Sequence, residues 1–225
     1  MITSHHNPLL KDIRRLQARR RRGRFVAEGE DLIAAAEEAG WEPVHLLRAG
    51  ENVDPDALAK VSALGSGSRV LGVYEERWAQ PTGPVCVGLW GVRDPGNVGT
   101  VLRGALAFGA GSVAIGPNTA DPYGPKAVRA SMGAIFAVPV ARVESIDALP
   151  GRKVALAARR GSVLRGPLEP GEEVTLLVGA EREGLPEDVI AACDEVAHIP
   201  IANESLNAAM AATLALYELH RVSEL

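Results

Sequence analysis

The stretch from Val85 to Gly109 constrains the fold most, because it predicts a buried strand, a tight turn and an amphipathic helix in succession. Val85 to Trp90 is a continuous apolar run of the kind found in parallel sheets that are covered on both faces. A Pro-Gly turn signal follows, with Asn97 as the expected helix N-cap. The apolar stripe of the helix consists of Val98, Val101, Leu102, Ala105 and Leu106. Gly109 stands where the helix should stop, so the stretch predicts one strand–helix unit of a parallel α/β fold.

Strands and helices alternate along the rest of the chain, on both sides of a Pro/Gly-rich turn. We expect residues 1–79 to form a small α/β domain, residues 80–84 a linker and residues 85–225 a larger domain. The expected elements of the small domain are helices at Asn7–Arg22, Gly29–Ala39 and Asp54–Leu64, and strands at Arg24–Ala27, Pro43–Leu47 and near Val70.

The larger domain is expected to be a mostly parallel sheet with helices on both faces. Beyond the opening unit, its strands are expected at Ser112–Ile115, Val154–Ala158, Thr175–Val178 and Glu195–Pro200. Its helices are expected at Pro125–Met132, Glu187–Ala192 and Ser205–Arg221, with a helical turn at Glu144–Leu149. Sheets of this class bind ligands beyond the carboxyl ends of their strands, so polar residues at those ends are candidate site residues.

The basic residues are concentrated at the N-terminus, although the formal charge of the whole chain is −4. Residues 1–30 contain eight basic and three acidic side chains, and four of the basic ones, Arg19 to Arg22, are consecutive. Adjacent like charges repel each other unless an anion is near, and Arg binds phosphate through its planar fork. The patch therefore favours contact with nucleic acid, the alternative being a solvated helix face.

Several classes of protein are disfavoured by what the sequence lacks. No apolar run is long enough to span a bilayer and the N-terminus has no signal-peptide core, so we expect a cytoplasmic protein without a membrane partner. Cys86 and Cys193 are isolated in apolar stretches and are interpreted as buried structural thiols. The five histidines have no metal-like spacing, and neither a P-loop motif nor a GxGxxG fingerprint is present. We therefore expect no metal.

Three stretches place polar residues in apolar surroundings at expected carboxyl ends of strands. The first joins Asn97 to Arg103, the only charged side chain between Asp94 and Asp121. The second, LVGAEREGL, places Glu181 between two glycines directly after a strand. The third, IPIANESLN, crowds a helix start with Asn203, Glu204, Ser205 and Asn207. Taken singly, each has an ordinary alternative: a solvated Arg, an exposed loop acid and plain N-caps.

Together, DPGNVGTVLR, LVGAEREGL and IPIANESLN resemble the three motifs of the SpoU (TrmH-like) family of RNA ribose methyltransferases, in the SPOUT superfamily. The intervening KAVRASMGAIFAVPV also resembles the family pattern, and an Ala-rich helix follows the third motif. The N-terminal NPLLKDIRRLQ and FVAEGEDLI look like the small RNA substrate-binding domain that precedes the catalytic domain in many members. The resemblance therefore covers nearly the whole chain.

The resemblance implies transfer of a methyl group from S-adenosyl-L-methionine to a ribose 2′-hydroxyl of RNA. It also implies a deep trefoil knot in the C-terminal domain and a homodimer whose subunits share the active site. The implied cofactor residues are Ala157, Ala158, Gly179, Glu181, Gly184, Ile199, Ile201, Ser205 and Leu206. The implied catalytic residues are Arg103, Asn97, Ser205, Asn207 and Glu181. The candidate RNA contacts are Arg14, Arg15, Arg19, Arg20, Arg21, Arg22 and Arg129.

Two questions stay open at this level. The family assigns Arg103 a central role, sometimes as a base, but a guanidinium pKa above ~12 argues for stabilising an alkoxide or gripping a phosphate instead. Arg159, Arg160 and Arg182 depart from the family pattern and are either phosphate contacts or surface charges. The separate basic domain favours ribosomal over transfer RNA. A catalytically silent RNA-binding homologue and a base-modifying SPOUT enzyme are the alternatives.

Overall fold

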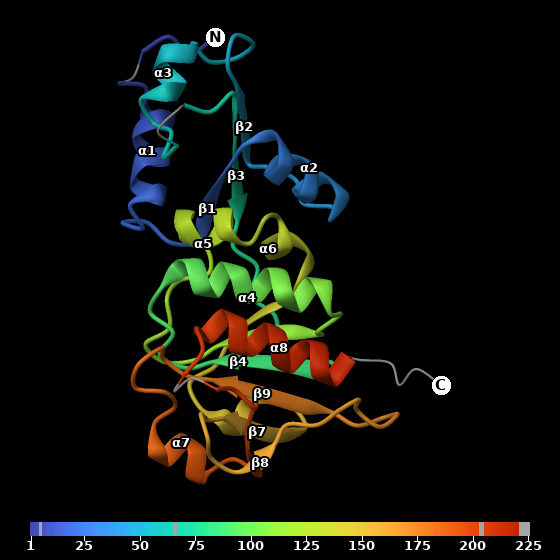
Figure 1. Ribbon diagram of the computed structural model, residues 1–225. Helices are drawn as coiled ribbons and strands as arrows, with labels where there is room; N and C mark the ends of the chain where they lie inside the picture. The colour runs from blue at the N-terminus through green and yellow to red at the C-terminus, as the bar shows by residue number, and fades with distance from the viewer. Residues whose placement is uncertain (5, 65–66, 203–204, 221–225) are drawn as a thin grey trace.

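The computed structural model describes residues 1–4, 6–64, 67–202 and 205–220, which form two lobes stacked one above the other (Figure 1). The N-terminal lobe holds a three-stranded antiparallel sheet in the order β1-β3-β2, with helices beside it. Its elements are β1 (Arg24–Glu28), β2 (His45–Arg48), β3 (Val70–Glu75), α1 (Pro8–Gln17), α2 (Glu30–Glu38) and α3 (Pro55–Ala59). The predicted alternation of strands and helices is confirmed in this part of the chain.

Helix α1 is shorter than its Arg-rich sequence predicts. Asn7 caps its start, because the side-chain oxygen accepts a hydrogen bond from the backbone N–H of Leu9 at 2.9 Å. The chain leaves the helix at Arg19, which has a left-handed φ of 52° and turns its guanidinium toward carboxylates of other segments. The predicted continuation to Arg22 is wrong, since ion pairs across the fold prevail over helix propensity.

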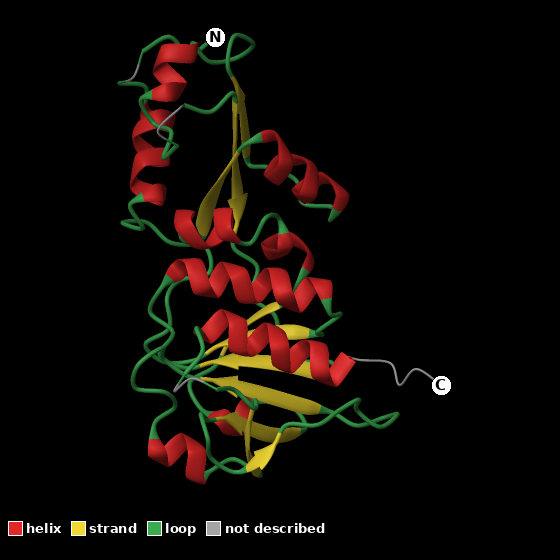
Figure 2. Ribbon diagram, viewed as in Figure 1, coloured by secondary structure: helices red, strands yellow, loops and turns green. Residues whose placement is uncertain are grey.

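The C-terminal lobe is built on a seven-stranded parallel sheet in the order β6-β5-β4-β9-β7-β10-β8 (Figure 2). Its strands are β4 (Val85–Leu89), β5 (Ser112–Ile115), β6 (Val140–Arg142), β7 (Arg152–Leu156), β8 (Ser162–Val163), β9 (Val174–Val178) and β10 (Glu195–His198). Its helices are α4 (Pro95–Ala107), α5 (Pro125–Ala130), α6 (Ala134–Ala137), η1 (Ile146–Ala148), α7 (Glu187–Ala191) and α8 (Ala208–His220). The predicted parallel α/β architecture is confirmed.

Helix α4 packs against helices α5, α6 and α8, and α8 lies beside α4 against the sheet (Figure 1). Asp94 caps it, accepting from the backbone N–H of Gly96 at 2.8 Å, so the prediction that Asn97 is the N-cap is wrong. Pro95 therefore occupies the first helical position, and Asn97 belongs to the first turn. The predicted stripe is buried except for Leu106, whose side chain is 49% exposed.

The strand order brings late segments of the chain into the middle of the sheet. Strand β9 lies between β4 and β7, and α8, which follows β10, returns to pack on α4 and β9. Because all neighbouring strands are parallel, their carboxyl ends meet at one edge of the sheet. The loops after β7, β9 and β10 therefore converge there.

An aromatic cluster joins the two lobes into one core. Phe25 lies 4.8 Å from Tyr123 and 5.7 Å from Phe136 between ring centroids, and Trp41 donates its indole N–H to the carbonyl of Phe136 at 2.8 Å. The segment between the sheets is also pinned, because the backbone N–H of Thr82 donates to the Ser112 hydroxyl at 2.8 Å. The chain changes sheets between β3 and β4, and the domain boundary at residues 80–84 stays a prediction.

Two sequence expectations concern the chemistry of the whole chain. Within the described residues, no helix is both long enough and apolar enough to cross a membrane. Both cysteines are free thiols; Cys86 is buried, whereas Cys193 is only half-buried, so the expectation of burial is wrong for Cys193.

Candidate active site

A cavity of about 280 Å³ lies where the loops after β7, β9 and β10 converge. Apolar side chains and backbone form most of its wall, and Glu181 brings a half-buried carboxylate to it. All nine predicted cofactor residues line the cavity, namely Ala157, Ala158, Gly179, Glu181, Gly184, Ile199, Ile201, Ser205 and Leu206. The fold thus gathers residues that are separated by up to fifty positions in the sequence around one small-molecule-sized space.

The loop after β9 is folded into a tight hairpin that only glycine permits. The backbones of Ala180 and Gly184 exchange hydrogen bonds of 3.1 and 3.0 Å. A Cβ at Gly179 would overlap the backbone of Gly184, and Gly184 itself has a left-handed φ of 69°. The two glycines of the second motif therefore set the position of Glu181 at the cavity.

One chain of hydrogen bonds connects the three motifs. Asn207 accepts from the backbone N–H groups of Ala209 and Met210 at 2.9 and 3.2 Å, which caps α8. Its side-chain N–H donates to the oxygen of Asn97 at 3.1 Å, and Asn97 donates in turn to the carboxylate of Glu181. The capping bonds occupy the oxygen of Asn207, so its nitrogen must face Asn97. The oxygen of Asn97 accepts that bond, so its own nitrogen faces the carboxylate of Glu181, which can only accept.

Of the predicted catalytic residues, Asn97 therefore contacts both Asn207 and Glu181. Ser205 is exposed and lines the same cavity. The remaining polar residues predicted at this helix start, Asn203 and Glu204, lie outside the described residues. The geometry makes Asn97 and Asn207 positioning residues for the Glu181 carboxylate.

Arg103 lies apart from this hydrogen-bonded chain. It follows Asn97 by six residues on α4, which is about 9 Å along the helix axis, and its side chain is exposed. No carboxylate pairs with it within the described part of the chain. Its guanidinium lies outside the cavity lining and is available for an anionic ligand or an external partner.

Arg160 and Glu187 also line the cavity, but the sequence indicates a possible role only for Arg160. They form a two-pronged ion pair, with nitrogen–oxygen distances of 2.6 and 3.2 Å, that joins the loop after β7 to the start of α7. The Arg160 guanidinium lowers the pKa of the Glu187 carboxyl. Arg160 therefore has an internal partner, and Arg159 donates to the carbonyl of Ala202 at 3.3 Å. Arg182 also lines the cavity.

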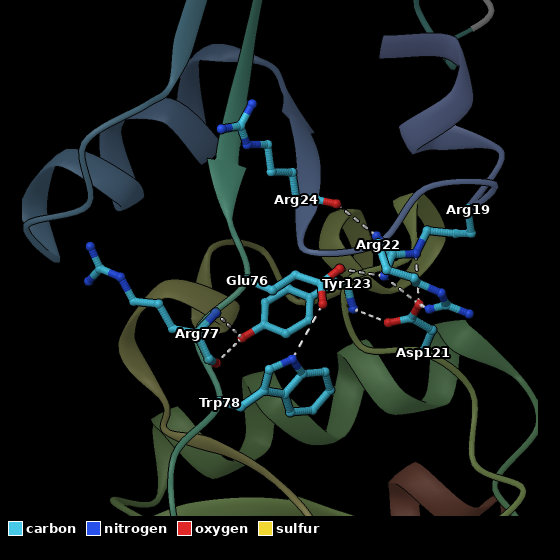
Figure 3. Close-up of polar contacts among 8 residues, drawn as sticks. All are labelled: Arg19, Arg22, Arg24, Glu76, Arg77, Trp78, Asp121 and Tyr123. Atoms are coloured by element: carbon cyan, nitrogen blue, oxygen red, sulfur yellow. Dashed lines mark hydrogen bonds and ion pairs between the residues drawn. The ribbon is translucent and has the colours of Figure 1, made fainter. Parts of the chain in front are cut away.

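The basic patch after α1 also has carboxylate partners inside the protein (Figure 3). Arg19 is only 13% exposed and binds Glu76 at 2.7 Å and Asp121 at 2.6 Å. Arg22 binds the same oxygen of Asp121, and Arg21 binds Asp12 at 2.6 Å. The expectation that these arginines need an external anion is wrong for Arg19, Arg21 and Arg22. Arg14, Arg15, Arg20 and Arg129 have no carboxylate partner within the described residues.

The fold and the cavity define an α/β protein with a small-molecule site at the carboxyl edge of a parallel sheet. The sequence model of the SpoU rRNA Methylase family matches residues 84–217, and the chain belongs to this family. The match begins at the residue before β4 and extends into α8, so it covers the entire sheet and the cavity.

Relatives extend the likeness to both lobes. The 23S rRNA (uridine(2479)-2′-O)-methyltransferase of Streptomyces viridochromogenes is 32% identical over 90% of this chain and 84% of its own. The 23S rRNA (guanosine(2553)-2′-O)-methyltransferase RlmP of Bacillus subtilis is 28% identical, over 97% of this chain and 98% of its own. The AdoMet-bound rRNA methyltransferase of Sinorhizobium meliloti has a similar structure, with a TM-score of 0.86 at 31% identity, covering 96% and 95% of the two chains.

Proposed function

We propose that this protein transfers a methyl group from S-adenosyl-L-methionine to a ribose 2′-hydroxyl of ribosomal RNA. The observation that carries the proposal is a cavity lined by the second and third family motifs, to which Asn97 of the first motif is connected by the hydrogen-bond chain from Asn207 through Asn97 to Glu181. The relatives named as 23S rRNA 2′-O-methyltransferases cover more than four-fifths of this chain and of their own. An enzyme with this substrate works where ribosomal RNA is, which we take to be the cytoplasm.

The cavity suits the cofactor in size, polarity and charge. When bound, S-adenosyl-L-methionine supplies an electrophilic methyl group on a sulfonium cation. Glu181 offers a carboxylate held ready by Asn97, and a fixed anion favours a cationic ligand. Ile199, Ile201 and Leu206 offer apolar contacts to the flat part of the ligand.

We propose that Arg103 stabilises the negative charge that develops on the ribose oxygen during transfer. A guanidinium does not lose its proton in a protein, so Arg103 serves by stabilising an alkoxide or by gripping a neighbouring phosphate, not as a base. Its exposure and its lack of a carboxylate partner within the described residues support this role. Ser205, exposed at the same cavity, is proposed to position the ribose.

We propose that α1 and α5 contribute the phosphate contacts. Arg14 and Arg15 of α1 and Arg129 of α5 are basic residues without internal carboxylate partners in the described chain, and Arg20 follows α1. These helices lie on the same side of the molecule, above α4 (Figure 1). Because Arg19, Arg21 and Arg22 form ion pairs within the protein, we expect them to stabilise the fold and to contribute less to RNA binding.

The methyl-transfer assay separates the proposal from its alternatives. Calorimetry with S-adenosyl-L-methionine should show binding, and incubation with total RNA from a strain lacking this gene should label ribosomal RNA at a ribose. Labelling of transfer RNA would show that transfer RNA is the substrate. A methyl group on a base would show that the protein modifies bases and not the ribose. Cofactor binding without transfer would indicate a silent homologue. Resistance of the modified nucleotide to alkaline cleavage identifies the ribose 2′-oxygen as the site.

We also propose a homodimer formed through α4 and α8. Exposed apolar side chains, Met210, Leu214 and Tyr217, follow one face of α8 at helical spacing, and Leu106 is exposed on the adjacent α4. Arg103 lies one turn from Leu106, so a partner on this face would border the active site.

The dimer is tested by light scattering coupled to size-exclusion chromatography. Leu214→Glu should give a monomer of half the wild-type mass, because it buries a charge in the apolar face. Met132, which is 55% exposed on the turn between α5 and α6, provides the control, and Met132→Glu should remain dimeric. A wild-type monomer at micromolar concentration would refute the dimer.

The trefoil knot is a further part of the proposal. It is supported by the insertion of β9 between β4 and β7 and by the return of α8 to α4 after β10. Pulling the chain from both termini in an optical trap tests it. A knotted chain, when stretched, stays shorter than its 225 residues allow, whereas an unknotted one reaches full length.

A further inference from the structure

A groove of about 670 Å³ lies at the carboxyl ends of β5 and β6, at the junction of the two lobes. Strand β4, which leads into α4 and Asn97, separates it from the cofactor cavity at β9, β7 and β10. The side chains at the groove that concern its chemistry are Arg22, Trp78, Asn118, Asp121, Arg142 and Glu144. Both lobes contribute, so the groove exists only in the assembled molecule.

Arg142 and Trp78 form a flat platform in this groove. The guanidinium carbon of Arg142 lies 4.1 Å from the centroid of the Trp78 ring. Arg142 ends the edge strand β6, its side chain is exposed, and no carboxylate pairs with it within the described residues. A planar cation stacked on an indole has a second face, and that face can stack on another planar group.

Trp78, the aromatic half of the platform, is held by contacts that join the lobes (Figure 3). The Trp78 indole N–H donates to Glu76 at 3.3 Å, and its ring packs edge-on against Tyr123 at 5.1 Å between centroids. Glu76 is in turn fixed by Arg19 at 2.7 Å. An aromatic ring that is already immobilised loses little entropy when a ligand binds against it.

The charges in the groove favour a neutral ligand over a phosphate. Two cations, Arg22 and Arg142, share it with three carboxylates, Glu76, Asp121 and Glu144. The guanidinium of Arg22 is already bound to Asp121. A nucleobase is planar and uncharged, and its polar edge can meet a side-chain amide.

Asn118 supplies such an amide. It lies on the loop after β5 with a left-handed φ of 58°, and its side chain is exposed. It has no hydrogen-bond partner within the described residues. An unpaired amide beside a stacking platform offers both a donor and an acceptor to a base edge.

We propose that this groove binds a base of a single-stranded part of the RNA substrate, stacked on Arg142 and read at its edge by Asn118. This inference rests on the proposed RNA methyl transfer. Strand β6 is three strand spacings from β9, about 14 Å at roughly 4.8 Å per spacing. The bound base therefore belongs to a nucleotide near the methylated ribose and not to that nucleotide itself.

Binding of fluorescein-labelled decaadenylate to the full-length protein tests the groove. Fluorescence anisotropy is measured over a series of salt concentrations for wild type, Arg142→Ala and Arg142→Lys. Both variants should raise the Kd by about tenfold, because a lysine keeps the charge but not the plane. The slope of log Kd against log salt should stay at the wild-type value, since no phosphate contact is lost. Asn118→Ala should weaken binding less.

Arg165→Ala provides the matched control, because Arg165 is also exposed and lies beyond β8, at the opposite margin of the sheet. It should bind as wild type does. Wild-type affinity of Arg142→Lys, or a fall of the salt slope by about 0.7 in Arg142→Ala, would make Arg142 a phosphate contact and overturn the proposal. Failure of the wild type to bind decaadenylate would also overturn the proposal, because stacking tolerates any base.

Calorimetric titration with S-adenosyl-L-methionine distinguishes failure of this inference from failure of the proposed function. The Arg142 variants should bind the cofactor as wild type does, because Arg142 is remote from the cavity. Absence of cofactor binding in the wild type would contradict the proposed function, whatever the oligonucleotide shows. Thermal unfolding of each variant verifies that the lobes remain joined.

Discussion

Arg103 is the residue on which the proposed chemistry depends most directly. If its guanidinium stabilises an alkoxide or binds a phosphate through two N–H groups, Arg103→Lys should lower kcat by about a hundredfold. Cofactor affinity should remain at the wild-type value, because Arg103 does not line the cavity. Single-turnover methyl transfer and calorimetry measure the two quantities. Near-normal transfer by Arg103→Lys would exclude a need for the guanidinium fork.

Tyr123 makes stability depend on pH in the alkaline range. Burial raises the pKa of Tyr123 to about 12, and its hydroxyl donates to the carbonyl of Arg77. Above pH 10 the unfolded chain loses the phenolic proton while the folded protein keeps it, so stability falls as pH rises toward 12. The loss attributable to this group is about 2–3 kcal/mol.

Tyr123→Phe should therefore be less stable than wild type at pH 8 but lose less stability between pH 10 and 12. Urea unfolding at each pH gives the free energies. The wild-type protein, unfolded over the same pH range, gives the reference curve. Equal alkaline losses in wild type and Tyr123→Phe would contradict the assignment. The pKa of Tyr74 is also raised by burial, so a residual alkaline loss is expected in both proteins.

At the residue scale, the sequence predicts the cavity well and the ion pairs poorly. The cavity residues are those that the family resemblance implies, and the fold gathers them because they follow strands whose carboxyl ends meet. Arg19 is misassigned because its partner Asp121 lies 102 positions away, and no local pattern reports such a contact. The Asn97–Asn207 bond, across 110 positions, is missed for the same reason.

At the scale of elements, two glycines show what α4 requires of its neighbours. A Cβ at Gly99 would overlap the carbonyl of Ala127 and lie 2.7 Å from the Cβ of Ala130, both on α5. Gly99→Ala should destabilise the protein by about 1–3 kcal/mol, because α4 and α5 would have to separate.

Gly104→Ala is the control on the same helix. A Cβ there meets chiefly the Thr213 side chain, at 3.0 Å, and alanine favours the helix by about 1 kcal/mol. Denaturant midpoints should therefore place Gly104→Ala at or above wild type and Gly99→Ala well below it. Equal midpoints for the two variants would show that α4 and α5 adjust freely.

The elements that the sequence does not predict are the short ones. Strands β6 and β8 have three and two residues, too few to show a period, and their pairing with β5 and β10 comes from the assembled sheet. Helix α3 ends at Ala59 and not at Leu64, because Ser62 turns to hydrogen-bond Glu28 at 2.7 Å. Strand β9 is predicted to within a residue, since its apolar run is continuous, whereas β7 runs from Arg152 to Leu156 and not, as predicted, from Val154 to Ala158.

At the scale of the molecule, the two lobes share a hydrophobic core that the linker sequence does not predict. A Pro/Gly turn suggests independent domains, yet one hydrophobic cluster contains Phe25 and Tyr74 of the first lobe with Tyr123 and Phe136 of the second. The ion pairs of Arg19 lie beside this cluster. If RNA binds at the arginines of α1, as proposed, the shared core holds it at a fixed distance from the cavity.

A shared core predicts that the lobes unfold together. Calorimetry of the wild type should show one transition, and Phe25→Ala should split it, the N-terminal lobe melting first. Removal of this ring costs about 3–5 kcal/mol and deletes the contacts to Tyr123 and Phe136 that couple the lobes. Leu10→Ala is the control, because Leu10 belongs to a cluster confined to the first lobe, and it should lower the single transition without splitting it. Two transitions in the wild type would show that the aromatic cluster does not couple the lobes.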